Sequence, residues 1–167
     1  MRLLDFAFSS FSPRLSPRSV LIVNGHPDPR PERFCAAVAE AYRNGVRNTG
    51  GKAEVLSIGA VKGESGWTDA ADRVRDSTEF MVVFPLWLDG PPPLLANLVA
   101  QAAPQRCHDA VVTMALPAFA HRSSAVHPEL VPLGEIRRAT FIGSVEALSL
   151  KQRKEWLAKI EKLPLAP

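Results

Sequence analysis

The stretch from Val20 to Phe34, VLIVNGHPDPRPERF, decides the fold. Its first four residues form a short, continuous run of aliphatic side chains, which is typical of a strand buried on both faces of a parallel sheet. Pro31 suits the first turn of a helix, and the apolar spacing that starts at Phe34 continues as far as Gly50-Gly51. We therefore expect a strand at the start of this stretch and a helix over residues 31–49.

The same alternation continues to the end of the chain. Further strands are expected at residues 53–58, 79–84, 109–114 and 139–145, and further helices at 67–78, 94–103 and 149–163. The last helix opens with a capping box formed by Ser149 and Gln152. Residues 116–138 are expected to be irregular, because prolines and a glycine interrupt every periodicity. This order predicts an α/β fold in which a five-stranded parallel sheet, in the flavodoxin-like order 2-1-3-4-5, carries helices on both faces.

Composition limits the classes of protein that the chain can be. Its 167 residues suit one domain, and 46% hydrophobic with 22% charged residues is a globular composition. No apolar run reaches the roughly 18 residues of a membrane helix, so no membrane span is expected. Much of the net charge of +3 comes from the arginines of residues 1–19, which leaves too little on the rest of the chain for a nucleic-acid-binding surface.

The first 19 residues differ from the remainder and are expected to form an N-terminal arm before a domain over residues 20–167. They are rich in Ser, Phe and Arg and twice contain Ser-Pro-Arg. Two interpretations are open: a flexible or partner-docking arm, which could attach the protein to a larger complex, and a mitochondrial transit segment. Cys35 and Cys107 form no C-x-x-C pair and are expected to be buried, which is typical of a reducing compartment, the cytoplasm or the mitochondrial matrix.

Ligands of such sheets bind beyond the carboxyl ends of the strands, where the strand order reverses. This rule selects the loops that follow Asn24, Phe84 and Met114. The first of them runs into a helix N-terminus, which favours an anion, and Arg30 and Arg33 could contact a phosphate. The chain contains neither G-x-G-x-x-G nor a P-loop, and the prolines of the loop reduce its supply of N–H donors.

Four stretches carry a resemblance to a known family. They are LIVNGHPDPRPERFCAAVAEAYRNGVRNTGGKAEVLSI in residues 21–58, VVFPLWL with Leu94-Leu95, VVTMALPAFAHR from Val111, and ATFIGSVEALSLKQRKEWL from Ala139. Together they resemble the bacterial flavodoxin-like NAD(P)H:quinone oxidoreductases over most of the chain after residue 19. The resemblance implies FAD or FMN as cofactor, NAD(P)H as co-substrate, a quinone as acceptor, and a homodimer.

The resemblance also assigns residues to the flavin. The loop from His26 to Phe34, with Asp28 and Arg33, would hold the phosphates, and the strand-three and strand-four loops would enclose the ring through Pro85, Leu86, Trp87, Leu88, Thr113, Met114, Ala115 and Leu116. Such a ring needs an apolar wall. On the residues alone, His26 could instead hydrogen-bond the loop backbone, and Trp87 and Leu88 could be ordinary core.

The chain also departs from the family pattern. Asp89-Gly90-Pro91-Pro92-Pro93 replaces a turn with one proline, and a negative charge at Asp89 suits a reduced, anionic flavin poorly. The tyrosine and histidine that the family uses near strand four are missing, so His121 is the candidate for protonating the reduced quinone. No pattern of metal ligands is present. Two hypotheses follow: a flavin-dependent NAD(P)H:quinone oxidoreductase, or a flavodoxin-like accessory or binding subunit without cofactor.

Overall fold

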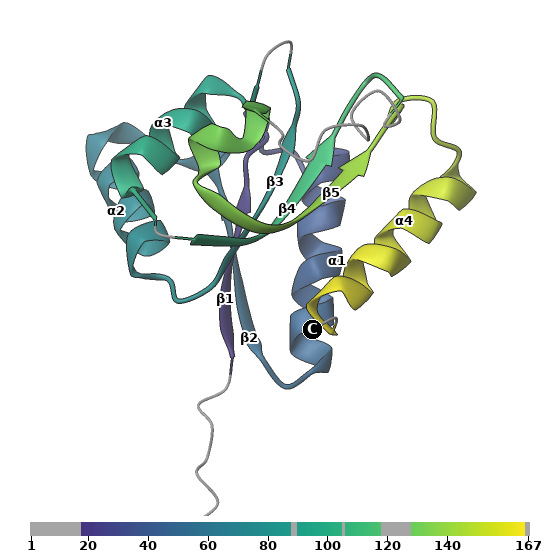
Figure 1. Cartoon of the computed structure of the whole chain (residues 1–167), viewed down its shortest axis with the longest axis horizontal. Helices are drawn as coiled ribbons and strands as arrows, with labels where there is room; N and C mark the ends of the chain where they lie inside the picture. The colour runs from purple at the N-terminus through teal and green to yellow at the C-terminus, as the bar shows by residue number, and fades with distance from the viewer. Residues whose placement is uncertain (1–17, 88–89, 105, 118–127, 166–167) are drawn as a thin grey trace, which may run out of the picture.

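The computed structural model describes residues 18–87, 90–104, 106–117 and 128–165. Its centre is a sheet of five parallel strands in the order β2-β1-β3-β4-β5 (Figure 1). The strands are β1 (Ser19–Asn24), β2 (Lys52–Ser57), β3 (Phe80–Pro85), β4 (Arg106–Thr113) and β5 (Glu135–Ile142). The expected fold class and strand order are therefore confirmed. β3 lies at the centre, and five of its six residues are buried, because helices cover it on both faces.

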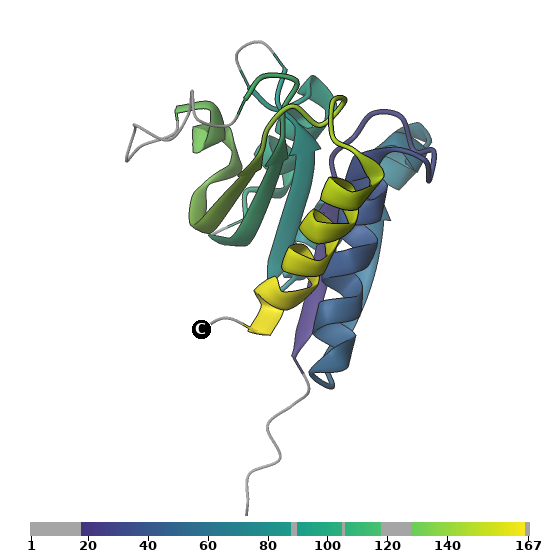
Figure 2. The same cartoon turned by 90° about the vertical axis from the view of Figure 1, so that its right-hand side faces the viewer.

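Helices α1 (Phe34–Asn48) and α4 (Leu150–Lys162) cover one face of the sheet side by side (Figure 2). Their contact is close because Gly45 has no side chain. A Cβ at this position would lie only 2.0 Å from the carbonyl oxygen of Glu161 on α4. Under the two helices lie Val20, Ile22, Met81 and Val83, all at most 2% exposed, which form the core of this face.

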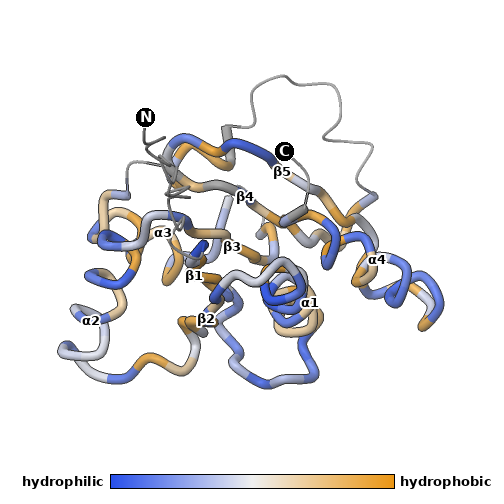
Figure 3. The backbone as a smooth tube through the Cα atoms, turned by 90° about the horizontal axis from the view of Figure 1, so that it is seen from below, coloured by the Kyte–Doolittle hydropathy of each residue, from blue (hydrophilic) through white to orange (hydrophobic). Residues whose placement is uncertain are grey.

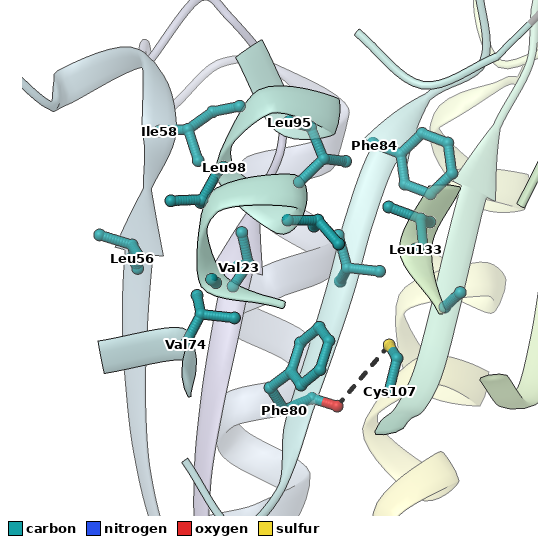
Figure 4. Close-up of a cluster of buried hydrophobic side chains, with 14 of the residues drawn as sticks. Val23, Leu56, Ile58, Val74, Phe80, Phe84, Leu95, Leu98, Cys107 and Leu133 are labelled. Carbon is teal, nitrogen blue, oxygen red and sulfur yellow. Dashed lines mark hydrogen bonds between the residues drawn. The ribbon is translucent and has the colours of Figure 1, made fainter. Parts of the chain in front are cut away.

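Helices α2 (Gly63–Asp76) and α3 (Pro93–Ala102) cover the other face, as the view from below shows (Figure 3). The core on this side is the larger of the two, and Figure 4 shows part of it. Phe80 and Phe84 from β3 pack there against Leu95 and Leu98 from α3. Cys107 lies in the same core with its sulfur 3.9 Å from the carbonyl oxygen of Phe80, so both cysteines are buried as expected.

Several boundaries differ from those expected. α1 begins at Phe34 instead of residue 31, because the N–H of Arg33 closes a turn on the carbonyl of Arg30. β4 begins three residues early and β5 four residues early, since the two strands pair from Arg106 and Glu135 onward. A 3-10 helix (Pro128–Leu133) precedes β5 in the stretch expected to be irregular. α2 also starts early, at Gly63.

A buried charged network explains how β4 accommodates the carboxylate of Asp109. Asp109 is 1% exposed, and its carboxylate accepts a hydrogen bond of 2.5 Å from the hydroxyl of Tyr42 on α1. Arg138 on β5 binds both oxygens of the same carboxylate, at 2.9 and 2.8 Å. Burial is the largest cause that raises the pKa of Tyr42, and the negative charge of Asp109 is the second. The single tyrosine of the chain is therefore a core residue that stabilises a buried ion pair.

Candidate functional site

The three loops selected from the sequence meet in one cavity of about 280 Å³ at the carboxyl edge of the sheet. β1, β3 and β4 are neighbours in the sheet, so the loops that follow them lie next to one another. The loop after β5 and the start of α4 complete the wall. The lining residues are His26, Glu32, Arg33, Phe34, Cys35, Pro85, Leu86, Trp87, Thr113, Met114, Ala115, Val145, Glu146 and Arg153.

The loop between β1 and α1 is held by a ladder of side chains that each bind the backbone two residues ahead. Asn24 Oδ1 accepts from the N–H of His26 at 3.1 Å, His26 Nδ1 accepts from Asp28 at 3.0 Å, and Asp28 Oδ1 accepts from Arg30 at 3.1 Å. Prolines occupy the intervening positions and have no N–H, namely Pro27, Pro29 and Pro31. From residue 26 to residue 31, each N–H group is therefore either absent or already bonded.

His26 thus has the role that the alternative interpretation gave it, a hydrogen bond to the loop backbone, and it also lines the cavity. Accepting a bond at Nδ1 requires the neutral ring with its proton on Nε2. Burial, followed by the positive charge of Arg33, lowers the pKa of His26. The neutral form that the ladder needs is therefore also the form that the surroundings favour.

Asp28 binds the two arginines that were expected to contact a phosphate. Its carboxylate accepts from Arg30 Nη2 at 2.6 Å and from Arg33 Nε at 2.7 Å. Hydrogen bonds from Arg30, the largest cause, and from Arg33 hold the pKa of Asp28 well below its usual range. Asp28 itself does not line the cavity, whereas Arg33 does. The loop therefore supplies, in the carboxylate of Asp28, an anion that binds both of its arginines.

The first turn of α1 supplies N–H donors at the cavity. No side chain caps this helix, and the N–H groups of Ala36 and Ala37 bond back to the carbonyl of Arg33. Within the described ranges, the N–H groups of Phe34 and Cys35 find no acceptor in another residue. Both residues line the cavity, so these donors and the helix dipole favour an anion there.

The β3 and β4 loops form an apolar wall. Trp87 is 47% exposed, so the interpretation as ordinary core is wrong for this residue. A tight turn holds it, in which Trp87 and Gly90 exchange two backbone hydrogen bonds of 3.0 and 2.7 Å. Pro85, Leu86, Met114 and Ala115 continue the wall. Leu116, 66% exposed, was expected to line the site but does not border the cavity. Leu88, Asp89 and His121 lie outside the described residues.

The floor of the cavity combines a thiol and a hydroxyl. Cys35 Sγ lies 3.4 Å from Thr113 Oγ1, and this hydroxyl also donates to the carbonyl of Phe84 at 3.3 Å. Burial raises the pKa of the Cys35 thiol to about 11. The thiol is therefore protonated at neutral pH and is a packing group of low reactivity.

Arg153 on α4 is a cavity residue that the sequence analysis missed. Its guanidinium stacks 5.4 Å above the ring of Phe34 and donates to the carbonyls of Val145 and Leu148 at 3.0 and 3.3 Å. No carboxylate of the described residues pairs with it, in contrast to Arg33. The rule of carboxyl-edge loops, applied also to the loop after β5, would have directed attention to this wall.

Comparison with known proteins depends on the fold alone. No protein-family model matches the chain, and no curated protein is similar to it in sequence. Solved structures match well. An NAD(P)H:quinone oxidoreductase from Methanothermobacter marburgensis has a TM-score of 0.63 at 14% identity, covering 88% of this chain and 94% of that one. An FMN-dependent NADH-azoreductase from Bacillus anthracis, in complex with FMN, has a TM-score of 0.62 at 9% identity, covering 90% and 100%.

The fold is flavodoxin-like. A general stress protein from Treponema denticola, also in complex with FMN, agrees with a TM-score of 0.59 at 16% identity, over 89% of this chain and 96% of that one. The flavodoxin-like chain thus shares its architecture with flavin-dependent oxidoreductases. Its described helices include none that is both long and apolar enough to cross a membrane. Nor do those residues contain a group of three or more side chains placed to bind a metal.

Proposed function

We propose that this protein is a flavin-dependent NAD(P)H:quinone oxidoreductase, with FAD or FMN as its cofactor. The observation that carries the proposal is the cavity in which the loops after β1, β3 and β4 meet. It lies where ligands of doubly wound sheets bind, and it combines an apolar wall, a helix N-terminus and a cation, Arg153, that pairs with no carboxylate of the described residues.

The residues present fit a flavin in three respects. A planar ring can pack against Trp87, Pro85 and Leu86. A phosphate can accept from the N–H groups of Phe34 and Cys35, and Arg153 offers a positive charge. A volume of about 280 Å³ is close to the lower limit, about 300 Å³, of typical small-molecule sites, so it would enclose the ring and leave the rest of the cofactor on the open side.

A bound flavin supplies hydride and electron transfer between NAD(P)H and a quinone. The chain's own residues would position the flavin ring and exclude water from it. Trp87 would shield one part of the cavity, and the stacked pair of Phe34 and Arg153 would form another part of its wall. His121 remains our candidate for the group that protonates the reduced quinone. Its replacement by Asn should then lower turnover without weakening flavin binding.

Flavin titration tests the proposal. FMN and FAD are added separately to the full-length protein, and calorimetry and flavin fluorescence report binding. Saturable binding in the micromolar range or tighter is expected, and the Trp87→Ala variant should bind more weakly. Because Trp87 is already 47% exposed, this variant should fold normally. Val131→Ala is the matched control, since it truncates an exposed apolar side chain outside the cavity.

A second function, an accessory or binding subunit without cofactor, is favoured by one observation. Asp28 already occupies Arg30 and Arg33, the cations nearest the first loop. If the folded protein shows no saturable binding of either flavin at high micromolar concentration, the oxidoreductase proposal is lost and the accessory function stands. In that case the part of the expected arm before the described chain, residues 1–17, becomes the segment to test for docking on a larger complex, because Ser19 belongs to β1 and Arg18 bonds to Glu79.

We also propose a homodimer. The exposed apolar side chains Trp87 and Leu116 lie on neighbouring loops at the carboxyl edge, where a second copy could complete the mouth of the cavity. Sedimentation velocity over a range of concentrations should give the mass of two chains. A single-chain mass at high concentration would contradict the dimer.

A further inference from the structure

Asp28 lies in the loop between β1 and α1 and binds both arginines of that loop. Its Oδ2 atom accepts from Arg30 Nε and Nη2 at 2.9 and 2.6 Å, and from Arg33 Nε at 2.7 Å. Arg33 Nη2 lies 2.5 Å from the same oxygen. Two nitrogens of the Arg33 guanidinium are therefore engaged by a carboxylate, although Arg33 lines the cavity.

We propose that Asp28 is a specificity-determining residue that acts as an internal anion and competes with the ligand's phosphate for Arg33. This inference rests on the proposed flavin function and adds to it that the phosphate is bound less tightly than the loop's arginines would allow. A guanidinium binds carboxylates and phosphates through the same fork of N–H groups, so the two anions exclude each other at one edge of Arg33.

The geometry also shows how to remove the competition without disturbing the loop. Asp28 Oδ1 accepts from the backbone N–H of Arg30 at 3.1 Å, which is the last rung of the ladder. In Asp28→Asn, the amide oxygen can keep this bond, while the amide nitrogen is a donor and cannot accept from Arg33. The substitution therefore releases the guanidinium and retains the turn.

Asp72→Asn is the matched control. Asp72 on α2 also pairs with an arginine, Arg75, at 2.5 Å, and it lies on the opposite face of the sheet from α1. Its substitution changes the net charge by the same amount and breaks an exposed ion pair of the same kind. A general charge effect would appear in both variants, and a local effect only in Asp28→Asn.

The experiment compares FMN, riboflavin, which lacks the phosphate, and inorganic phosphate as ligands of the full-length wild type and both variants. We expect Asp28→Asn to raise the ratio of FMN to riboflavin affinity about five- to thirtyfold and to strengthen phosphate binding, with a smaller effect at high salt. Asp72→Asn should leave the ratio at the wild-type value. Adding Arg33→Gln to Asp28→Asn should abolish the gain.

The two proposals fail separately. If the wild type and Asp28→Asn bind neither FMN nor riboflavin, the flavin function is wrong, and phosphate binding alone then decides the role of Asp28. Competition by Asp28 is overturned if Asp28→Asn leaves both measured quantities at their wild-type values. These are the affinity for phosphate and the ratio of FMN to riboflavin affinity. An equal gain in Asp72→Asn would overturn it as well.

Discussion

At the residue scale, Arg153 is the most direct probe of an anionic ligand, because the other cavity arginine is bound to Asp28. Arg153→Met keeps a long side chain over Phe34 and removes the charge. If a phosphate lies near it, flavin affinity should fall roughly ten- to hundredfold, the loss typical of a charge-assisted hydrogen bond. Calorimetric titration measures the change.

The control for this prediction is Lys154→Met, which removes a positive charge from the exposed neighbour on α4. Thermal unfolding of both variants is also required, since Arg153 donates to the carbonyls of Val145 and Leu148. Equal flavin affinities in two folded variants would exclude Arg153 from the phosphate site.

His26 should make stability depend on pH through the ladder. Its pKa in the folded protein is lowered from 6.5, so the folded state holds the neutral ring at pH values where the unfolded chain takes up a proton. The contribution is complete above about pH 6.5, the unfolded value, and is lost as the pH falls towards the lowered folded pKa. Urea unfolding at pH 7.5 and 5.5 measures it.

His26→Asn separates this effect from other titrating groups, because an amide oxygen can accept from the Asp28 N–H but does not titrate. The wild type should lose more stability than the variant between the two pH values. If both proteins show the same pH dependence, protonation of His26 does not weaken the ladder.

At the element scale, the position of the β1–α1 loop depends on Gly59. This residue lies in the 3-10 helix Ile58–Ala60, which directly follows β2. A Cβ there would lie 2.2 Å from the carbonyl oxygen of Pro27, which is backbone and cannot yield cheaply. Gly59→Ala should therefore destabilise the protein by about 1–3 kcal/mol and weaken flavin binding by displacing the loop. Urea unfolding and flavin titration test the two effects.

Gly66→Ala is the matched control within α2. The nearest atom to its added Cβ would be Val61 Cγ1, at an ordinary 3.4 Å. Because alanine favours helix over glycine, this variant should be more stable by about 0.5–1 kcal/mol. If Gly59→Ala behaves like Gly66→Ala, the close approach does not fix the loop.

The element order could be predicted because each buried strand is a continuous apolar run and proline or glycine marks most helix ends. The start of β4 could not, since Arg106, Cys107 and His108 form no apolar run and belong to the strand only through their pairing with β5. The partners of Asp109 could not be predicted either, because the fold brings Arg138 and Tyr42 to it. The candidate site, too, could be predicted only in part. The three loops came from strand order alone, whereas the Arg33–Asp28 pair depends on the local turn, and Arg153 comes from the far end of the chain.

At the scale of the whole molecule, the boundary of the folded domain can be placed more closely. Ser19 already belongs to β1, and Arg18 donates to Glu79 Oε2 at 2.7 Å and to the carbonyl of Pro164 at 2.8 Å. Deletion of residues 1–17 should therefore leave the melting temperature unchanged. Arg18→Met in the full chain should lower it by about 2–4 °C, the equivalent of about 1 kcal/mol for a domain of this size.

Thermal unfolding of the two proteins decides between these expectations. A loss of several degrees on deletion of residues 1–17 would mean that the arm contributes to the core or covers an interface. An unchanged melting temperature in Arg18→Met would mean that its ion pair and hydrogen bond contribute nothing measurable.

The bond between Arg18 and Pro164 brings the beginning and the end of the described chain together at the amino edge of the sheet, opposite the cavity. A short peptide linker could therefore join the two ends after removal of the arm, and new ends could be opened at Gly50-Gly51, in the turn between α1 and β2 at the same edge. Such a circular permutant would begin with β2 and finish with α1. All the described loops around the cavity would remain uncut, so the candidate site would survive a complete reordering of the chain that builds it.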